Sequence, residues 1–186
     1  MLDWDALVNE CSNCNKCELG QTRLNIVIER GSRNAPVMLV GEGPGEQEDR
    51  QGKPFVGAAG HLLDNLLEAL LFKDEDYYIC NIVKCRPPNN RVPTEEEAEQ
   101  CLGFLRNQVA LIRPKIIICM GATAMKYIVD RNSKITQIRG QWIERKGYYI
   151  MPTFHPAALL RDESKKVLMF EDVKKVKRKL DEFNNI

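Results

Sequence analysis

Four short apolar segments, rich in β-branched residues, punctuate the chain. They cover residues 37–40, 77–83, 115–120 and 148–152. Apolar runs of this length, without polar alternation, are typical of strands that are buried on both faces of a parallel sheet. The sequence therefore predicts four buried strands.

The segments between these strands have helical spacing. Residues 58–71 carry leucines at positions 62, 63, 66, 67, 70 and 71, which form one apolar stripe. Residues 94–112 open with Thr-Glu-Glu-Glu, which is typical of a helix start capped by threonine. Two further helices are predicted over residues 122–129 and 167–183. The order β-α-β-α-β-α-β-α predicts an α/β fold, a three-layer α/β/α sandwich around a mostly parallel four-stranded sheet.

The composition is that of an ordinary globular protein of one domain. The 186 residues are 44% hydrophobic and 28% charged, and the net charge is +1. This balance excludes a polycationic protein, so any surface for nucleic acid has to be a local patch. The first residues lack the basic start and apolar core of a signal peptide, and no apolar run is long enough for a membrane span. We expect a cytoplasmic protein.

A glycine-rich segment, residues 41–49, directly follows the first predicted strand. Ligands of α/β folds usually bind at such a strand end. The segment contains no lysine, carries four carboxylates and fits neither of the common phosphate-binding glycine patterns. Because carboxylates repel phosphate, we expect this segment to handle a neutral group or a developing cation close to the backbone.

Seven cysteines are many for a chain of this length, and three of them form a C-x2-C-x2-C motif at positions 11, 14 and 17. A ferredoxin pattern would need a further cysteine where Gln21 stands. Cys80 and Cys119 lie inside predicted strands, where cysteine is usually a small buried hydrophobic residue. Two thiols of the motif with Cys85 and Cys101 would make four ligands, which suit zinc or a [4Fe–4S] cluster equally well. The alternative is a set of unrelated buried thiols.

A second signature follows the last predicted strand, in residues 152–161, where His155 precedes a proline. Together with residues 41–49, 52–57 and 79–91, it resembles the family 4 uracil-DNA glycosylases, the iron–sulfur branch of their superfamily. The resemblance runs from about Cys14 to the carboxyl terminus. It implies a DNA repair enzyme that flips uracil out of DNA and hydrolyses its N-glycosidic bond, leaving an abasic site.

The resemblance implies one [4Fe–4S] cluster held by Cys14, Cys17, Cys85 and Cys101. Cys11 is then an extra thiol, which either replaces Cys14 as a ligand or stays free. No motif demands electron transfer, so we expect the cluster to be structural. It would tie the amino-terminal segment to residues 85–101 within a single domain that spans residues 1–186.

The family positions also imply how the base is held. Phe55 matches the aromatic residue on which the flipped uracil stacks, and Asn81 matches the residue that reads its edge. Glu48 matches the position whose side chain would clash with the methyl group of thymine. Backbone N–H groups of the turn at Gly43 and Gly45 are further candidate donors to the base.

Cleavage passes through a cationic sugar, while negative charge moves onto the departing base. We expect Glu42 to stabilise the cation and orient the attacking water. His155, as a neutral imidazole, is expected to donate to O2 of uracil. Glu46 and Asp49 are expected to be solvated.

On the DNA side, Leu159, Leu160 and Arg161 match a loop that enters the minor groove, although either leucine alone is as well explained by core packing. Five basic residues are predicted phosphate contacts: Lys84, Arg86, Arg91, Lys165 and Lys166. We expect a monomer that acts on uracil in single- or double-stranded DNA. Some relatives in the superfamily hold the product covalently through an inserted loop that contains a histidine. Residues 86–94 contain no histidine, so turnover should be hydrolytic.

Two alternatives remain open. One is a non-catalytic iron–sulfur protein that binds nucleic acid, against which the combination of Glu42, Phe55, Asn81 and His155 argues. The other is a glycosylase of the same superfamily with broadened base specificity. Family 5 enzymes lack a carboxylate at the position of Glu42, so its presence favours the uracil-specific branch.

Overall fold

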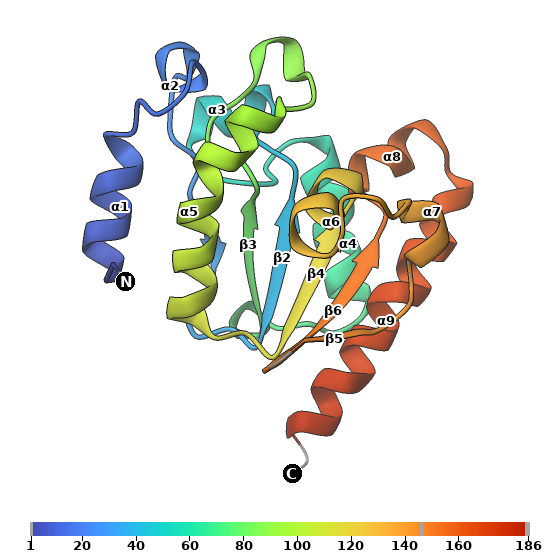
Figure 1. Ribbon diagram of the computed structural model, residues 1–186. Helices are drawn as coiled ribbons and strands as arrows, with labels where there is room; N and C mark the ends of the chain where they lie inside the picture. Colours follow the sequence, from blue (N-terminus) through green and yellow to red (C-terminus); the bar gives the residue numbers. More distant parts are fainter. Residues whose placement is uncertain (1, 146, 185–186) are drawn as a thin grey trace.

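The computed structural model describes residues 2–145 and 147–184, and their core is one six-stranded sheet with the order β1-β3-β2-β4-β6-β5 (Figure 1). The four predicted strands are present and run parallel to one another. They are β2 (Val37–Gly41), β3 (Tyr77–Asn81), β4 (Ile116–Met120) and β6 (Tyr148–Thr153).

The expectation of four strands was wrong, because an antiparallel strand is added at each edge of the sheet. These strands are β1 (Arg30–Gly31) and β5 (Ile143–Arg145), which pair with β3 and β6 respectively. Each is too short to leave a periodic pattern in the sequence. They exist because neighbouring strands offer backbone partners.

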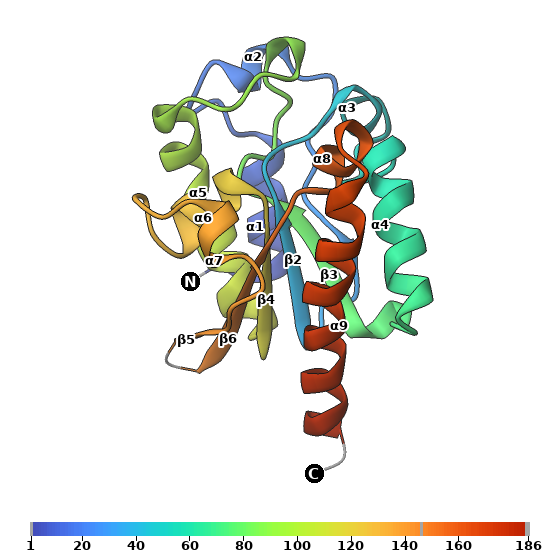
Figure 2. The same cartoon turned by 90° about the vertical axis from the view of Figure 1, so that its right-hand side faces the viewer.

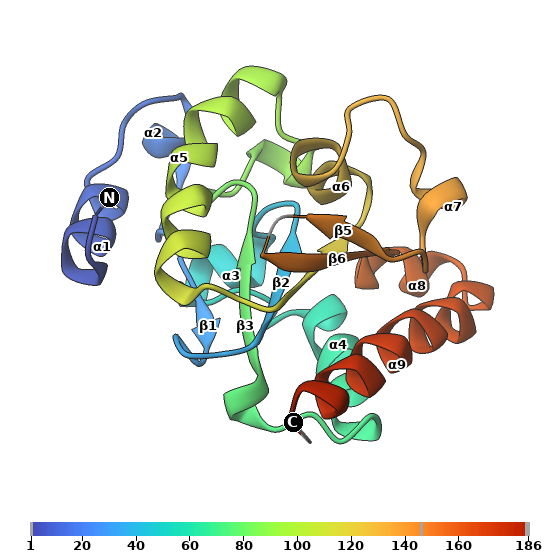
Figure 3. The same cartoon turned by 60° about the horizontal axis from the view of Figure 1, so that its bottom comes forward.

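Helices cover both faces of the sheet, as expected for a three-layer sandwich (Figure 3). One face carries α4 (Ala58–Ala69) and α9 (Ser164–Asn184), and the other carries α5 (Glu95–Ile112) and α6 (Ala122–Ile128). Outside α5 lies α1 (Trp4–Ser12). The shorter elements are α2 (Leu19–Thr22), α3 (Glu46–Gln51), η1 (Asp74–Asp76), η2 (Pro88–Asn90), α7 (Ile135–Ile138) and α8 (Pro156–Arg161).

Alternation along the strands divides the interior into two apolar cores. Leu39 and Ile118 face the core under α4 and α9, whereas Cys80 and Cys119 face the core under α5 and α6. Both cysteines are 0% exposed. Their prediction as small buried hydrophobic residues is confirmed.

The parallel strands all end at one edge of the sheet, and α2, α3 and α8 lie at that end (Figures 1 and 2). The glycine-rich segment 41–49 lies at the same end. Only its first part is a loop, because α3 begins at Glu46 with Gly45 as its N-cap. Among the described residues, no helix combines the length and apolar character that crossing a membrane requires.

Candidate active site

A cleft of about 750 Å³ opens where the parallel strands end. Glu42 follows β2, Asn81 is the last residue of β3, and His155 follows β6. Phe55 reaches the same cleft from the loop between α3 and α4. Four side chains that are far apart in sequence are thus brought together, as the motifs predicted.

Asn81 presents an unsatisfied acceptor to this cleft. Asn81 is 1% exposed and lines the cleft, and its Oδ1 has no hydrogen-bond partner among the described residues. Leaving a buried acceptor unpaired costs about 1–3 kcal/mol. A ligand that donates a hydrogen bond here would remove that cost.

Gly41 is required by the packing around Asn81. The two residues are paired across β2 and β3. A Cβ at position 41 would lie 2.5 Å from Oδ1 of Asn81 and 2.7 Å from Cζ of Phe55. The glycine therefore permits close approach of two side chains, which is one of the established uses of this residue.

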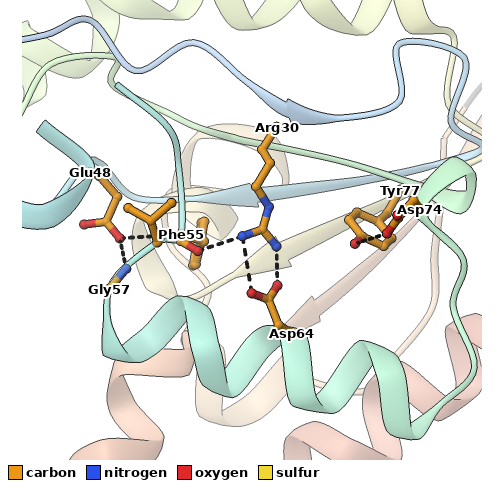
Figure 4. A network of polar contacts seen from close by, with 8 residues as sticks. Arg30, Glu48, Phe55, Gly57, Asp64, Asp74 and Tyr77 are labelled. Atoms are coloured by element: carbon orange, nitrogen blue, oxygen red, sulfur yellow. Dashed lines mark hydrogen bonds and ion pairs between the residues drawn. The ribbon is translucent and has the colours of Figure 1, made fainter. Parts of the chain in front are cut away.

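Phe55 has a left-handed backbone conformation, with φ at 56°, and is 5% exposed. This conformation is unfavourable for a bulky residue and persists only where surrounding contacts hold it. Nη1 of Arg30 donates to the Phe55 carbonyl oxygen at 2.8 Å, and Arg30 also pairs with Asp64 on α4 (Figure 4). A Cβ at Gly60 would lie 2.0 Å from the same carbonyl oxygen.

Glu48 holds the other side of the Phe55 loop. Its Oε1 accepts hydrogen bonds from the N–H groups of Val56 and Gly57, each at 2.9 Å (Figure 4). Its Oε2 accepts from the N–H of Gly45 at 3.1 Å. The N–H of Gly45 is thus already engaged, and Gly43 also lines the cleft. Glu48 is a positioning residue for the loop in addition to its predicted role against thymine.

His155 is arranged to donate through Nε2. Its Nδ1 accepts a hydrogen bond from the N–H of Ala157 at 3.1 Å, so the proton of the neutral imidazole resides on Nε2. Burial lowers the pKa of His155 to about 4, although Glu48 opposes that shift. Its ring lies 5.5 Å from that of Phe55, with 30° between the planes.

Glu42 is oriented by a residue that the sequence did not single out. The hydroxyl of Thr123, in the first turn of α6, donates to Oε2 of Glu42. Both residues line the cleft. One carboxylate oxygen is therefore fixed by the connection between β4 and α6.

The two remaining carboxylates of the glycine-rich segment differ from each other. Glu46 is exposed and pairs with Arg50 at 2.6 Å, so its prediction as a solvated charge is confirmed. The same prediction for Asp49 was wrong, because Asp49 is 2% exposed. Its Oδ1 accepts from the N–H groups of Leu24 at 3.0 Å and Asn25 at 3.3 Å, which fixes the segment before β1.

The segment expected to enter the minor groove contains both buried and exposed side chains. Leu159 is 5% exposed and packs in the core between the sheet, α4 and α9, so core packing accounts for it. Leu160 is 53% exposed, and Arg161 lines the cleft. Leu160 and Arg161 are therefore the members of this segment available to DNA.

The predicted phosphate contacts differ in their exposure to solvent. Arg86 is partly exposed, and Arg91 lines the cleft while it donates to both carboxylate oxygens of Glu97 at 2.8 and 2.6 Å. Lys84 was wrongly predicted, because it is 1% exposed. Its Nζ donates to the carbonyl oxygen of Asn81 at 2.6 Å, inside the protein.

A second, smaller pocket collects the cysteines of the motif and those after β3 and on α5. All of the following line it: Cys11, Cys14, Cys17, Cys85 and Cys101. Within the described residues, no three His, Cys, Asp or Glu side chains are placed to hold one metal ion together. The five cysteines around this shared space are candidate cofactor ligands, because thiolates are the ligands of iron–sulfur clusters.

Arg23 joins the two halves of this pocket. Nη1 donates to Sγ of Cys85 at 3.3 Å and to the carbonyl oxygen of Cys14 at 2.9 Å. Nη2 donates to the carbonyl oxygen of Ser12 at 2.8 Å. Cys11 lies deeper than Cys14, being 1% exposed in a small core with Phe104.

Sequence reasoning missed Thr123, Arg30 and Arg23 for a common reason. The partners of these three residues lie 81, 25 and 62 positions away in the chain. None of the three belongs to a motif with local spacing. Their proximity to the site arises only when the strands are assembled.

Comparison with known proteins places this geometry in a family. The family model of the uracil DNA glycosylase superfamily matches residues 28–181. The type-4 uracil-DNA glycosylase of Thermotoga maritima is 46% identical over 168 residues, which cover 88% of each chain. Those of Saccharolobus solfataricus and Sulfurisphaera tokodaii are 43% and 42% identical, covering 95% and 93% of this chain and 86% and 83% of theirs. The chain belongs to the uracil-DNA glycosylase superfamily, among its type-4 enzymes.

Proposed function

We propose that this chain flips uracil out of DNA into the cleft and hydrolyses its N-glycosidic bond, as a step of base excision repair. The observation that carries the proposal is the convergence of Glu42, Phe55, Asn81 and His155 on one cleft, with Oδ1 of Asn81 unsatisfied among the described residues. The chain acts as a single glycosylase domain, and turnover is hydrolytic, ending in an abasic site.

Uracil stacks on Phe55, and Asn81 reads its edge. Oδ1 of Asn81 accepts from N3–H of uracil, and the amide N–H donates to O4. Cytosine presents an acceptor at N3 and a donor at N4, so it leaves both groups unpaired. The Gly43 N–H adds a donor to the base. The Glu48 side chain excludes thymine by leaving no space for its methyl group.

Cleavage transfers the electron pair of the C1′–N1 bond to the base, and the charge is shared with O2. His155 donates from Nε2 to O2, which stabilises the leaving anion, an electrostatic contribution that is often large in enzymes. Glu42 stabilises the cationic sugar and orients a water whose oxygen bonds to C1′. The released uracil anion and the water proton combine through solvent.

Leu160 fills the space that the flipped nucleotide leaves, and Arg161, Arg86 and Arg91 contact phosphates. Unstacking a base costs a few kcal/mol, which these contacts and those of the cleft offset. Uracil in single-stranded DNA lacks a pairing cost, so both forms are substrates. The enzyme acts as a monomer. None of its seven cysteines, all of which lie in the described part of the chain, forms a disulfide, which supports a reducing, cytoplasmic location.

Cys14, Cys17, Cys85 and Cys101 would hold a [4Fe–4S] cluster, and its chemistry there is cross-linking rather than electron transfer. It ties the amino-terminal segment to the connection after β3 and to α5. Arg23 already links the same segments. Cys85→Ser should lower solubility and the absorbance near 400 nm together, and full stability of that variant would contradict a structural cluster.

The deciding experiment is uracil release from labelled single- and double-stranded oligonucleotides. Glu42→Gln and His155→Ala should each lower the rate by roughly 10²–10⁴-fold, the range for loss of one catalytic group. Matched controls are Glu171→Gln, an exposed carboxylate on α9 outside the cleft, and His61→Ala, the only other histidine. Both controls should retain activity.

The other outcomes are equally informative. DNA binding with an intact cluster but no release of any base would make the chain a non-catalytic binding protein. Release of hypoxanthine or thymine alongside uracil would indicate broadened specificity. Full activity in both catalytic variants would overturn the assigned roles.

A further inference from the structure

Lys84 is a buried cation without a carboxylate partner. It is 1% exposed and is among the largest fully buried side chains. None of the ion pairs found in the described part of the chain includes it. Its Nζ has the carbonyl oxygen of Asn81 at 2.6 Å as an acceptor. A buried ammonium group is costly unless negative charge lies nearby.

The negative charge available to Lys84 is that of the cysteine pocket. Lys84 lines this pocket and directly precedes Cys85 in the chain. The Lys84 side chain is therefore buried beside the cysteine thiols.

Cations beside the cysteine pocket would offset the negative charge of the thiolates. Sulfur ligands bind metal only as thiolates, and four thiolates outweigh the positive charge of an iron–sulfur core, so the loaded centre would keep net negative charge inside the protein. Arg23 offers a cation to Cys85 from the partly exposed side. Lys84 lines the same pocket and is buried.

We infer that Lys84 is the buried counter-charge of the cysteine centre and that it ties this centre to the strand end that carries Asn81. The inference rests on the proposed cluster. Lys84 then has a positioning role, since it lines the cysteine pocket while its ammonium group donates to the backbone of Asn81, the residue proposed to read uracil.

Lys84→Met tests the inference, because Met has a similar length and no charge. Iron per protein and absorbance near 400 nm are measured, followed by the rate of bleaching in bathophenanthroline. We expect lower iron content and bleaching roughly tenfold faster than wild type, the factor for one lost charge-assisted contact. Lys16→Met is the matched control, because Lys16 lines the same pocket but is exposed. It should behave as wild type.

If Lys84 has no specific role at the cysteine pocket, the opposite result is expected. Replacing a buried charge by an apolar side chain is often neutral or stabilising when the charge has no specific partner. Wild-type iron content and bleaching in Lys84→Met, or equal effects of Lys84→Met and Lys16→Met, would overturn the inference. If Lys84→Met does not accumulate as folded protein, Lys84→Arg decides, because it keeps the charge and should keep its iron.

Failure of the proposed cluster is distinguishable from failure of this inference. Wild-type protein purified without oxygen that holds no iron and shows no absorbance near 400 nm would overturn both. Wild-type protein with iron, together with an unaffected Lys84→Met variant, would overturn only the role of Lys84. Circular dichroism of each variant separates loss of iron from loss of fold.

Discussion

Thr123 donates a hydrogen bond through its hydroxyl to Oε2 of Glu42, across 81 positions of the chain. Glu42 follows β2, whereas Thr123 lies in the first turn of α6. The bond makes the connection after β4 part of the active site. It restricts the carboxylate that is proposed to face the cationic sugar.

Replacing Thr123 by Val should therefore impair catalysis more than binding. A hydrogen bond to a charged group contributes about 1.5–3 kcal/mol, so the maximal rate of uracil release should fall by roughly tenfold or more with little change in KM. Thr123→Ser, which keeps the hydroxyl, should restore most of the rate. Equal impairment of the Val and Ser variants in single-turnover assays would show that packing, and not the hydroxyl, matters.

Replacing Gly41 by Ala should push Asn81 and Phe55 apart. The added Cβ would lie 2.5 Å from Oδ1 of Asn81, and overpacking of this kind costs about 1–3 kcal/mol. We expect weaker inhibition by free uracil and a lower melting temperature. Gly103→Ala is the control, because nothing lies within 4 Å of a Cβ there and helix propensity should stabilise it slightly. Unchanged inhibition in Gly41→Ala would contradict the close approach.

Arg30 should affect uracil binding although it does not line the cleft, because it supports the backbone of Phe55. Arg30→Met removes the donor to the Phe55 carbonyl oxygen and leaves Asp64 unpaired, so the left-handed conformation of Phe55 loses a support. We expect a higher KM and weaker inhibition by free uracil. Arg33→Met, which removes a surface pair with Glu29, is the control. If both variants bind uracil as wild type does, Phe55 is held by other contacts.

His155 should remain neutral throughout the physiological pH range. Its pKa in the folded protein is about 4, below the ordinary 6.5, because it is buried. Proton NMR with only two histidines can follow this titration, and His155→Gln assigns the signals. An imidazole that titrates near 6.5 would contradict the prediction.

The same shift has a defined sign for stability. Between about pH 6.5 and 4 the unfolded chain binds a proton at His155 that the folded chain does not. The free energy of unfolding should therefore fall as the pH is lowered through this window, and fall less steeply in His155→Gln.

Cys11 and Cys14 should respond differently to replacement. Cys11 is 1% exposed and packs with Leu7 and Phe104, so we expect Cys11→Ala to keep the iron content of the wild type. Cys14→Ala should lose iron and absorbance near 400 nm. The reverse result would make Cys11 the ligand.

Much of the fold follows from local patterns. The central strands and the helices that cover them were predicted because hydrophobic periodicity depends only on neighbours in the chain. The edge strands β1 and β5 were not, because a strand of two or three residues has no period and forms only where a neighbouring strand offers hydrogen bonds.

The chemistry of the site could be read from residue types and their order: a carboxylate after the first central strand, an amide at the end of the next, a histidine after the last, and cysteines at metal-binding spacing. Tertiary structure alone decided which side chains are accessible and which touch. It buried Asp49, Lys84 and Leu159, and it joined Thr123 to Glu42. Residue type and spacing are local properties, whereas burial and pairing depend on elements that are distant in the chain and meet only when the sheet forms.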